Sequence, residues 1–88
     1  MEQYQARMMA VSLAGHDKGK RYVVLGQEGN CFCLVDGKTK LLEKPKRKNQ
    51  KHVQLIKQFP PKIREELEKI REDADVRRVL ANYNRPTE

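Results

Sequence analysis

Alternating apolar and polar positions fill the first two thirds of the chain. Such alternation places every second side chain on the same face of a β-strand. The pattern predicts strands over residues 8–13, 21–25, 31–35, 38–42 and 52–56. Glycine-containing turns separate the first three strands, and Asp36-Gly37 is a two-residue hairpin signal that leads into the fourth. Successive strands up to the fourth are therefore expected to pair antiparallel.

Five strands this short leave unpaired edges unless the sheet curls and closes on itself. We therefore expect a mainly β fold, a small five-stranded barrel, over residues 1–58.

The apolar period changes to that of a helix in the last third. Ile63, Leu67 and Ile70 recur at helical spacing after Pro60-Pro61, which suits a helix entrance. A second stripe is formed by Val76, Val79, Leu80 and Tyr83. In one continuous helix the two stripes would face opposite sides, so a break near 73–75, where either Asp can cap a new helix, is expected. Residues 59–85 are therefore interpreted as two short α-helices that extend the barrel.

Composition and charge narrow the functional classes. The chain has 88 residues and a net charge of +7, and residues 38–51 hold seven basic side chains against Glu43 alone. At this length one small domain without a deep substrate cavity is expected. A basic block repels itself unless water or a polyanion surrounds it, and nucleic acid is the leading polyanion. The block lacks interleaved large apolar residues, and no apolar run is long enough to span a bilayer, so we expect a cytoplasmic protein without membrane contact.

Cys31 and Cys33 lie two residues apart in an expected strand. Their spacing along one strand face reaches or exceeds the span of an unstrained disulfide. A zinc site would need His16 and His52 to converge on them, and the spacing lacks the turn of structural zinc sites. We expect buried, reduced thiols, and neither a metal nor another cofactor.

The segment 15–21 is the first candidate site. Two glycines suit a tight turn, and Asp17 is expected to accept hydrogen bonds from the backbone of that turn. Exposed N–H groups flanked by cations suit phosphate oxygens. The alternative is a charged turn whose glycines serve geometry only. The candidate RNA-binding residues here are Gly15, His16, Asp17, Lys18, Gly19, Lys20 and Arg21.

The segment 44–52 is the second candidate site. Pro45 interrupts strand pairing and the polar run offers little to bury, which predicts a mobile loop between the fourth and fifth strands. Its cations can each neutralise a phosphate. The alternative is a solvated charged surface. The candidate RNA-binding residues are Lys44, Lys46, Arg47, Lys48, Asn49, Lys51 and His52.

Residues 9–36, centred on the sequence SLAGHDKGKRYVV, resemble the KOW motif of large-subunit ribosomal proteins and NusG-type transcription factors. With the stretches at 36–38, 42–49 and 51–54, the chain is similar to short bacterial KOW-domain RNA-binding proteins related to an archaeal and eukaryotic ribosomal protein. The resemblance implies a Src-homology-3-like five-stranded barrel, association with RNA or the ribosome, and no catalysis. By position it places the RNA-facing loop on Gly15, Asp17, Lys18, Gly19 and Lys20. Family members usually carry Arg or Lys where this chain has His16, so that position lacks a permanent charge.

The expected function is non-catalytic binding of structured RNA, ribosomal RNA or the ribosome, by a monomer. With no Trp and five scattered Phe and Tyr residues, the chain lacks a stacking platform for single-stranded bases, which favours contacts to the RNA backbone. No motif combines a nucleophile with a base, and no catalytic residue is expected. The alternative is a protein-interaction adaptor of the translation or transcription machinery that uses the barrel or the C-terminal helices.

Overall fold

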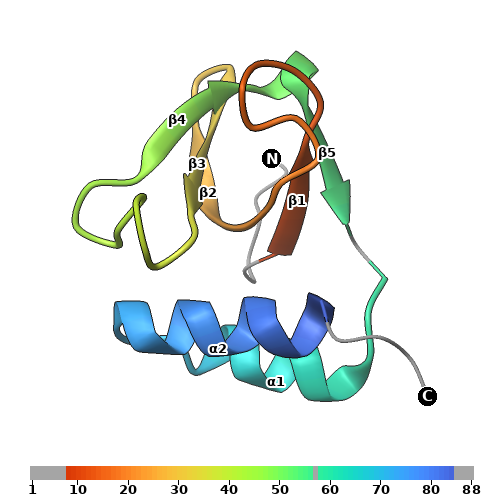
Figure 1. Cartoon of the computed structure of the whole chain (residues 1–88), viewed down its shortest axis with the longest axis vertical. Helices are drawn as coiled ribbons and strands as arrows, with labels where there is room; N and C mark the ends of the chain where they lie inside the picture. Colours follow the sequence, from red (N-terminus) through yellow and green to blue (C-terminus); the bar gives the residue numbers. More distant parts are fainter. Residues whose placement is uncertain (1–7, 57, 85–88) are drawn as a thin grey trace.

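The alternating segments of the first two thirds build one antiparallel sheet, and two helices lie side by side against it (Figure 1). The computed structural model describes residues 8–56 and 58–84, so the expected limits at residues 1 and 85 fall outside it. The strand order is β4-β3-β2-β1-β5. The elements are β1 Met8–Ser12, β2 Arg21–Glu28, β3 Cys31–Val35, β4 Lys46–Asn49, the 3-10 turn η1 Gln50–His52, β5 Val53–Ile56, α1 Pro61–Glu68 and α2 Asp73–Asn84. The expected fold class, a small mainly β unit followed by two helices, is confirmed.

The sheet curls strongly, as Figure 1 shows. A register shift in the β2–β3 pairing between Val24 and Gly26 marks a bulge, which increases local bending. The two edge strands, β4 and β5, are connected through η1. Among the described residues no ladder pairs β4 with β5, so the hydrogen bonding forms a curled sheet rather than a complete ring.

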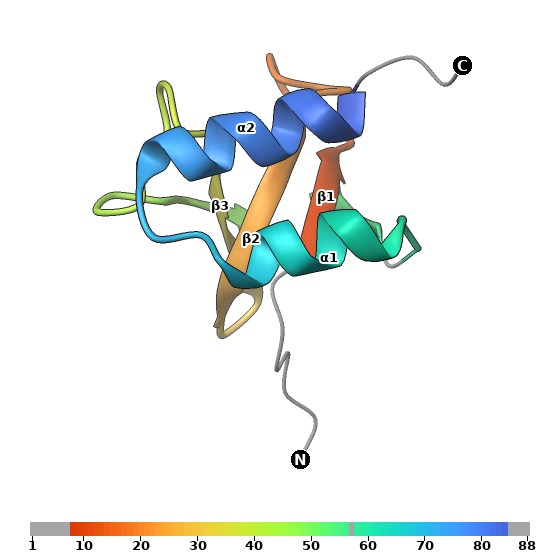
Figure 2. The same cartoon turned by 90° about the horizontal axis from the view of Figure 1, so that it is seen from below.

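Strand alternation divides the apolar residues between two cores. The inner core lies on the inside of the curl and contains Ala10, Tyr22, Val24, Phe32, Leu34 and Val53. The outer core lies between the sheet and the helices and joins Met9, Val23 and Val35 to Ile63, Leu67, Ile70, Val76, Val79 and Leu80. Figure 2 shows both helices crossing the same side of β1 and β2. Neighbouring residues of one strand thus pack into different cores, because their side chains point to opposite faces of the sheet.

The position of the fourth strand differs from the sequence prediction. Residues 38–42 belong to a loop in which Asp36 accepts backbone hydrogen bonds from Lys38, Thr39 and Lys40 at 2.8–3.0 Å. Because these N–H groups already donate to a nearby side chain, they are not available for pairing with a neighbouring strand. The strand is instead β4, inside the basic segment that was expected to be a mobile loop, and it pairs along the whole of its length with β3. Residue 52 is part of η1, so the last strand begins at Val53.

The two-helix prediction is confirmed, with the break a few residues earlier than expected. The first helix, α1, ends at Glu68, and both apolar stripes face the sheet. The Asp75 carboxylate accepts hydrogen bonds from the backbone of Arg71 and Glu72 in the connection. Asp73 accepts one from the Leu42 backbone N–H at 2.8 Å. The Asp75 carboxylate stabilises the break between the helices, and the Asp73 carboxylate attaches α2 to the loop of residues 36–45 between β3 and β4. The sequence predicts only a helix cap at these aspartates.

The cysteines are free thiols on one face of β3, half-buried rather than buried. Burial, and next the charge of Glu28, raises the pKa of the Cys33 thiol. Within the described residues there is no group of three or more His, Cys, Asp or Glu side chains placed to hold a metal ion. None of the helices in that part of the chain has the length and apolar character needed to cross a membrane.

Gly37 allows α2 to approach the sheet closely. Its φ is +79°, and a Cβ at this position would lie 2.6 Å from the Asp73 carbonyl oxygen and 2.8 Å from Arg77 Cγ. The Arg77 guanidinium in turn donates a hydrogen bond to the Gly37 carbonyl at 2.7 Å. A residue with a side chain here must move the helix.

We predict that Gly37→Ala destabilises the protein by about 3–5 kcal/mol, from left-handed strain plus overpacking. Gly19→Ala, at a φ of +89° with open space around the added carbon, should cost only about 1–2 kcal/mol. Gly26→Ala, with neither strain nor contact, should change stability by less than about 1 kcal/mol. Urea unfolding of the wild type and the three variants measures the change in the free energy of unfolding for each substitution. Equal costs at Gly37 and Gly19 would refute the close approach of α2.

Candidate nucleic-acid interface

The carboxylate of Asp17 lies at the centre of the two segments singled out in the sequence. It accepts hydrogen bonds from Ser12 Oγ at 2.8 Å and from Tyr22 Oη at 2.6 Å. It also forms ion pairs with Lys46 Nζ at 2.9 Å and Lys48 Nζ at 3.2 Å. The Asp17 side chain is only 14% exposed. These five side chains, the Asp17 cluster, join the β1–β2 loop to strand β4.

The alternation of β4 explains why its lysines turn inward. Lys46 pairs with Leu34 and Lys48 with Phe32, both inner-core residues, so the two lysines lie on the inner face of the sheet. Lys48 Nζ also donates to the Ala14 carbonyl at 3.0 Å. Their aliphatic stems extend along the inner core while their ammonium groups meet the loop. The β1–β2 loop, residues 13–20, is thereby fixed over the edge of the core.

Ionisation in the Asp17 cluster is strongly perturbed. Burial acts to raise the pKa of Asp17, but the hydrogen bonds from Tyr22, Lys46, Ser12 and Lys48 together outweigh it and hold the pKa well below its ordinary range. Burial, followed by the hydrogen bond and the charge of Asp17, raises the pKa of Tyr22. The cluster therefore contains a carboxylate and a neutral phenol at every pH near neutrality.

A second ion pair anchors the other end of the loop. Lys20 Nζ lies 2.6 Å from Asp36 Oδ2, and the Asp36 side chain is 4% exposed. Burial acts to raise the pKa of Asp36, yet the hydrogen bond from Lys20 and those from the backbone of the 36–45 loop hold it well below its ordinary range. Lys20 thus connects the β1–β2 loop to the segment that follows β3.

The backbone of the β1–β2 loop is already hydrogen-bonded internally. The N–H groups of Lys18, Gly19 and Lys20 donate to the carbonyls of Gly15, Ser12 and Asp17 at 2.8–3.2 Å. Gly15 and Gly19 supply the positive φ values, +90° and +89°, that the turn requires. The expectation that these N–H groups are open to phosphate is wrong, as is the expectation that the Asp17 carboxylate caps them. The N–H groups of these three residues are therefore occupied, and the exposed cationic side chains are what this part of the loop offers to a ligand.

The remaining candidates divide by exposure. His16 and Lys18 are exposed on the loop, and Lys51 and His52 are exposed on η1. The Leu13 N–H donates to the His52 carbonyl at 2.8 Å, so the start of the β1–β2 loop lies beside the end of η1. Asn49 accepts from the Lys51 N–H and so caps η1.

Two further cations extend along β4. Arg47 points to the opposite face from Lys46 and Lys48 and pairs with Glu28 at 2.9 Å, both side chains more than 60% exposed. Lys44 is exposed just before the strand. We call the exposed cations of this sheet edge, Lys18, Lys44, Arg47 and Lys51, the basic edge. Arg21, by contrast, lies near α2, with its guanidinium 5.6 Å from the centre of the Tyr83 ring.

Sequence reasoning treated the bases of 44–52 as equivalent, whereas the structure assigns them different roles. Lys46 and Lys48 stabilise the fold and are mostly covered, at 29% and 13% exposure. Sequence reasoning also missed Lys38 and Arg77. These two residues lie with Lys20 and Arg21 around one pocket. The period-2 rule applied to 46–49 would have separated the inward lysines from Arg47, but Pro45 pointed to a loop.

We predict that Asp17→Asn lowers the free energy of unfolding by about 2–3 kcal/mol at pH 7, because two half-covered ammonium groups lose their counter-charge. The folded pKa of Asp17 lies below the unfolded one, so its stabilisation is complete above about pH 5 and is lost progressively as the pH falls further. The difference between wild type and variant should therefore shrink between about pH 5 and pH 2. Urea titrations across this range measure it, and a difference independent of pH would show that the charge of Asp17 does not matter.

Comparisons with known proteins leave the family open. No protein-family model matches the chain, and no curated protein sequence matches it. The resemblance to KOW-type proteins therefore rests on the residues at 9–36 and 36–54 themselves.

Proposed function

We propose that this protein is a non-catalytic RNA-binding module that contacts the phosphate backbone of structured RNA, with ribosomal RNA as the expected target. The single observation that carries the proposal is the basic edge. Its cations come from the β1–β2 loop (Lys18), from strand β4 and the residue just before it (Arg47 and Lys44), and from η1 (Lys51). The Asp17 cluster holds the β1–β2 loop against β4. Several exposed cations around one edge strand suit the phosphates of a folded RNA.

The charges of the basic edge are available to a ligand. Within the described part of the chain, Lys18, Lys44 and Lys51 form no ion pair. Arg47 has a partner, Glu28, but both side chains are largely exposed, and such surface pairs contribute little and exchange readily. A phosphate can therefore replace the carboxylate of Glu28 at small cost.

The positions of the aromatic side chains support backbone recognition over base stacking. Tyr22 and Phe32 are buried in the inner core, at 1% and 4% exposure. RNA-binding sheets that stack bases present such residues to solvent. The similarity of the β1–β2 loop to the KOW motif points to the same partner, because in that family the loop faces RNA.

The adaptor alternative gains no support from the helices. The apolar stripes that could have formed a partner groove are buried in the outer core, with Ile63, Leu67, Val76 and Val79 all at 5% exposure or less. A protein partner would have to dock on the polar outer faces of α1 and α2. The RNA-binding proposal is therefore the one that the exposed residues favour.

Binding to a folded ribosomal RNA fragment should depend steeply on salt. Four phosphate contacts, one for each cation of the basic edge, predict a slope of about −3 for log K against log salt, since each contact contributes roughly 0.7–0.9. Fluorescence anisotropy at several salt concentrations measures this slope. A slope near zero would contradict a phosphate-dominated interface.

The double variant Lys18→Glu/Lys51→Glu should bind this RNA about 20-fold more weakly at ~0.1 M salt, because each lost contact removes roughly 0.7 log unit. The matched control is Lys62→Glu/Lys69→Glu, which makes the same change of charge at exposed positions at the two ends of α1. Equal weakening by both variants would show that only net charge matters and that the basic edge is not the interface. Lys46 and Lys48 are unsuitable targets because their loss would disturb the fold.

A further inference from the structure

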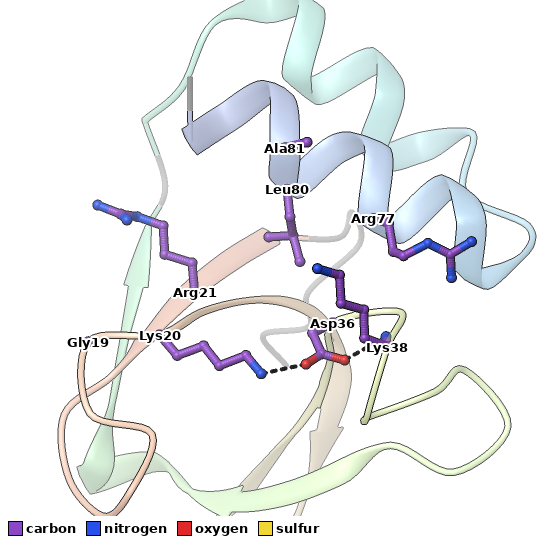
Figure 3. A pocket seen from close by; sticks show the side chains of 8 residues that line it. All are labelled: Gly19, Lys20, Arg21, Asp36, Lys38, Arg77, Leu80 and Ala81. Carbon is purple, nitrogen blue, oxygen red and sulfur yellow. Dashed lines mark hydrogen bonds and ion pairs between the residues drawn. The ribbon is translucent and has the colours of Figure 1, made fainter. Parts of the chain in front are cut away.

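A pocket lies on the other side of the β1–β2 loop, between the sheet and α2 (Figure 3). Its volume is about 390 Å³, within the range of small-ligand sites. Three segments that are distant in the sequence form its walls, namely Gly19, Lys20 and Arg21, then Asp36 and Lys38, then Arg77, Leu80 and Ala81.

The pocket has an excess of positive charge. Four cationic residues line it, and its one acidic residue, Asp36, is buried and already accepts hydrogen bonds from Lys20, Thr39 and the neighbouring backbone. Lys38 has no ion-pair partner among the described residues, and Figure 3 shows its side chain extending toward Leu80. An ammonium group in this position is short of a counter-ion, which an anionic ligand can supply.

The walls are held rigidly. Arg77 is fixed by its hydrogen bond to the Gly37 carbonyl, and the tight packing of Gly37 against α2 sets the distance between the helix and the loop that carries Lys38. Leu80 and Ala81 add an apolar wall opposite the charged one, and Figure 3 shows Leu80 directed at the space beside Lys38. The pocket therefore pairs cations with a small apolar surface, as ribose-phosphate recognition requires.

We propose that this pocket binds the phosphate group of a nucleotide. The ammonium group of Lys38 supplies the charge, and Leu80 and Ala81 contact the attached sugar. The phosphate can come from a strand of bound RNA, which rests on the proposed function, or from a free nucleotide, which does not. In the first case α2 and the β1–β2 loop contact the RNA together, and Lys20 and Arg21 serve this pocket rather than the basic edge.

The test is a titration of the isotope-labelled full chain with inorganic phosphate, AMP and a short RNA hairpin, followed by NMR of the backbone amides. We expect AMP or the RNA to shift the amides of Lys38 and Ala81. Ala81→Leu fills the pocket without altering charge at an exposed helix position, and it should abolish these shifts. Lys38→Gln should weaken binding of the same probe about five-fold at ~0.1 M salt, for one lost phosphate contact, whereas Lys69→Gln, outside the pocket, should not.

The outcomes separate the two proposals. If no probe shifts the Lys38 and Ala81 amides, or if Ala81→Leu binds like wild type, the pocket proposal is overturned. RNA-induced shifts at Lys18 and Lys51 in the same spectra would then leave the proposed function standing. If AMP shifts Lys38 and Ala81 while RNA shifts neither region, the pocket is a free-nucleotide site and the RNA-binding function fails. Thermal unfolding of each variant confirms that it is folded.

Discussion

The carboxylate of Asp17 is the group on which the basic half of the molecule depends. Two hydroxyl groups and two ammonium groups converge on it from β1, β2 and β4. Without this charge, the inward lysines of the edge strand would face an apolar core with no anion to offset them. The β1–β2 loop is therefore fixed to the edge strand because one carboxylate is kept ionised between them.

The charges of strand β4 also bear on how this edge of the sheet meets other chains. An edge strand leaves one row of backbone groups open to pairing with another sheet, and natural proteins discourage this with charged side chains. Strand β4 is such an edge, and exposed cations stand within it and on both sides of it, namely Arg47, Lys44 and Lys51. The repulsion that keeps two copies of the edge apart is the same field that attracts a polyanion. One charge pattern can thus discourage pairing between sheet edges and attract a polyanion.

The sequence predicted those features of the fold that arise from the periodicity of apolar residues. Strands β1, β2, β3 and β5 and the two helices all follow from patterns of period 2 or 3.6. The fourth strand was misplaced because its inward positions are Lys46 and Lys48, and a pattern rule looks for apolar residues there. Only a carboxylate from thirty residues earlier makes those positions suitable for a strand, and such a long-range pairing leaves no local signal. The prediction of a strand over residues 38–42 failed for a related reason. The backbone N–H groups there donate to the side chain of Asp36 rather than to a partner strand. The structure joins segments 15–21 and 44–52 through the Asp17 cluster, and the division of their bases into mostly covered and exposed side chains could not be read from the sequence.

The anchoring of the β1–β2 loop at both ends has a consequence for the thermodynamics of binding. Lys48 holds one end to β4, and Lys20 holds the other to the loop after β3. A free loop of this length would lose conformational entropy when a ligand ordered it, at roughly 1–2 kcal/mol for each residue fixed. Here that loss occurs during folding, so any ligand of the loop meets a backbone that is already ordered. Association can then proceed at the rate of electrostatically guided collision, without waiting for a rearrangement of the chain.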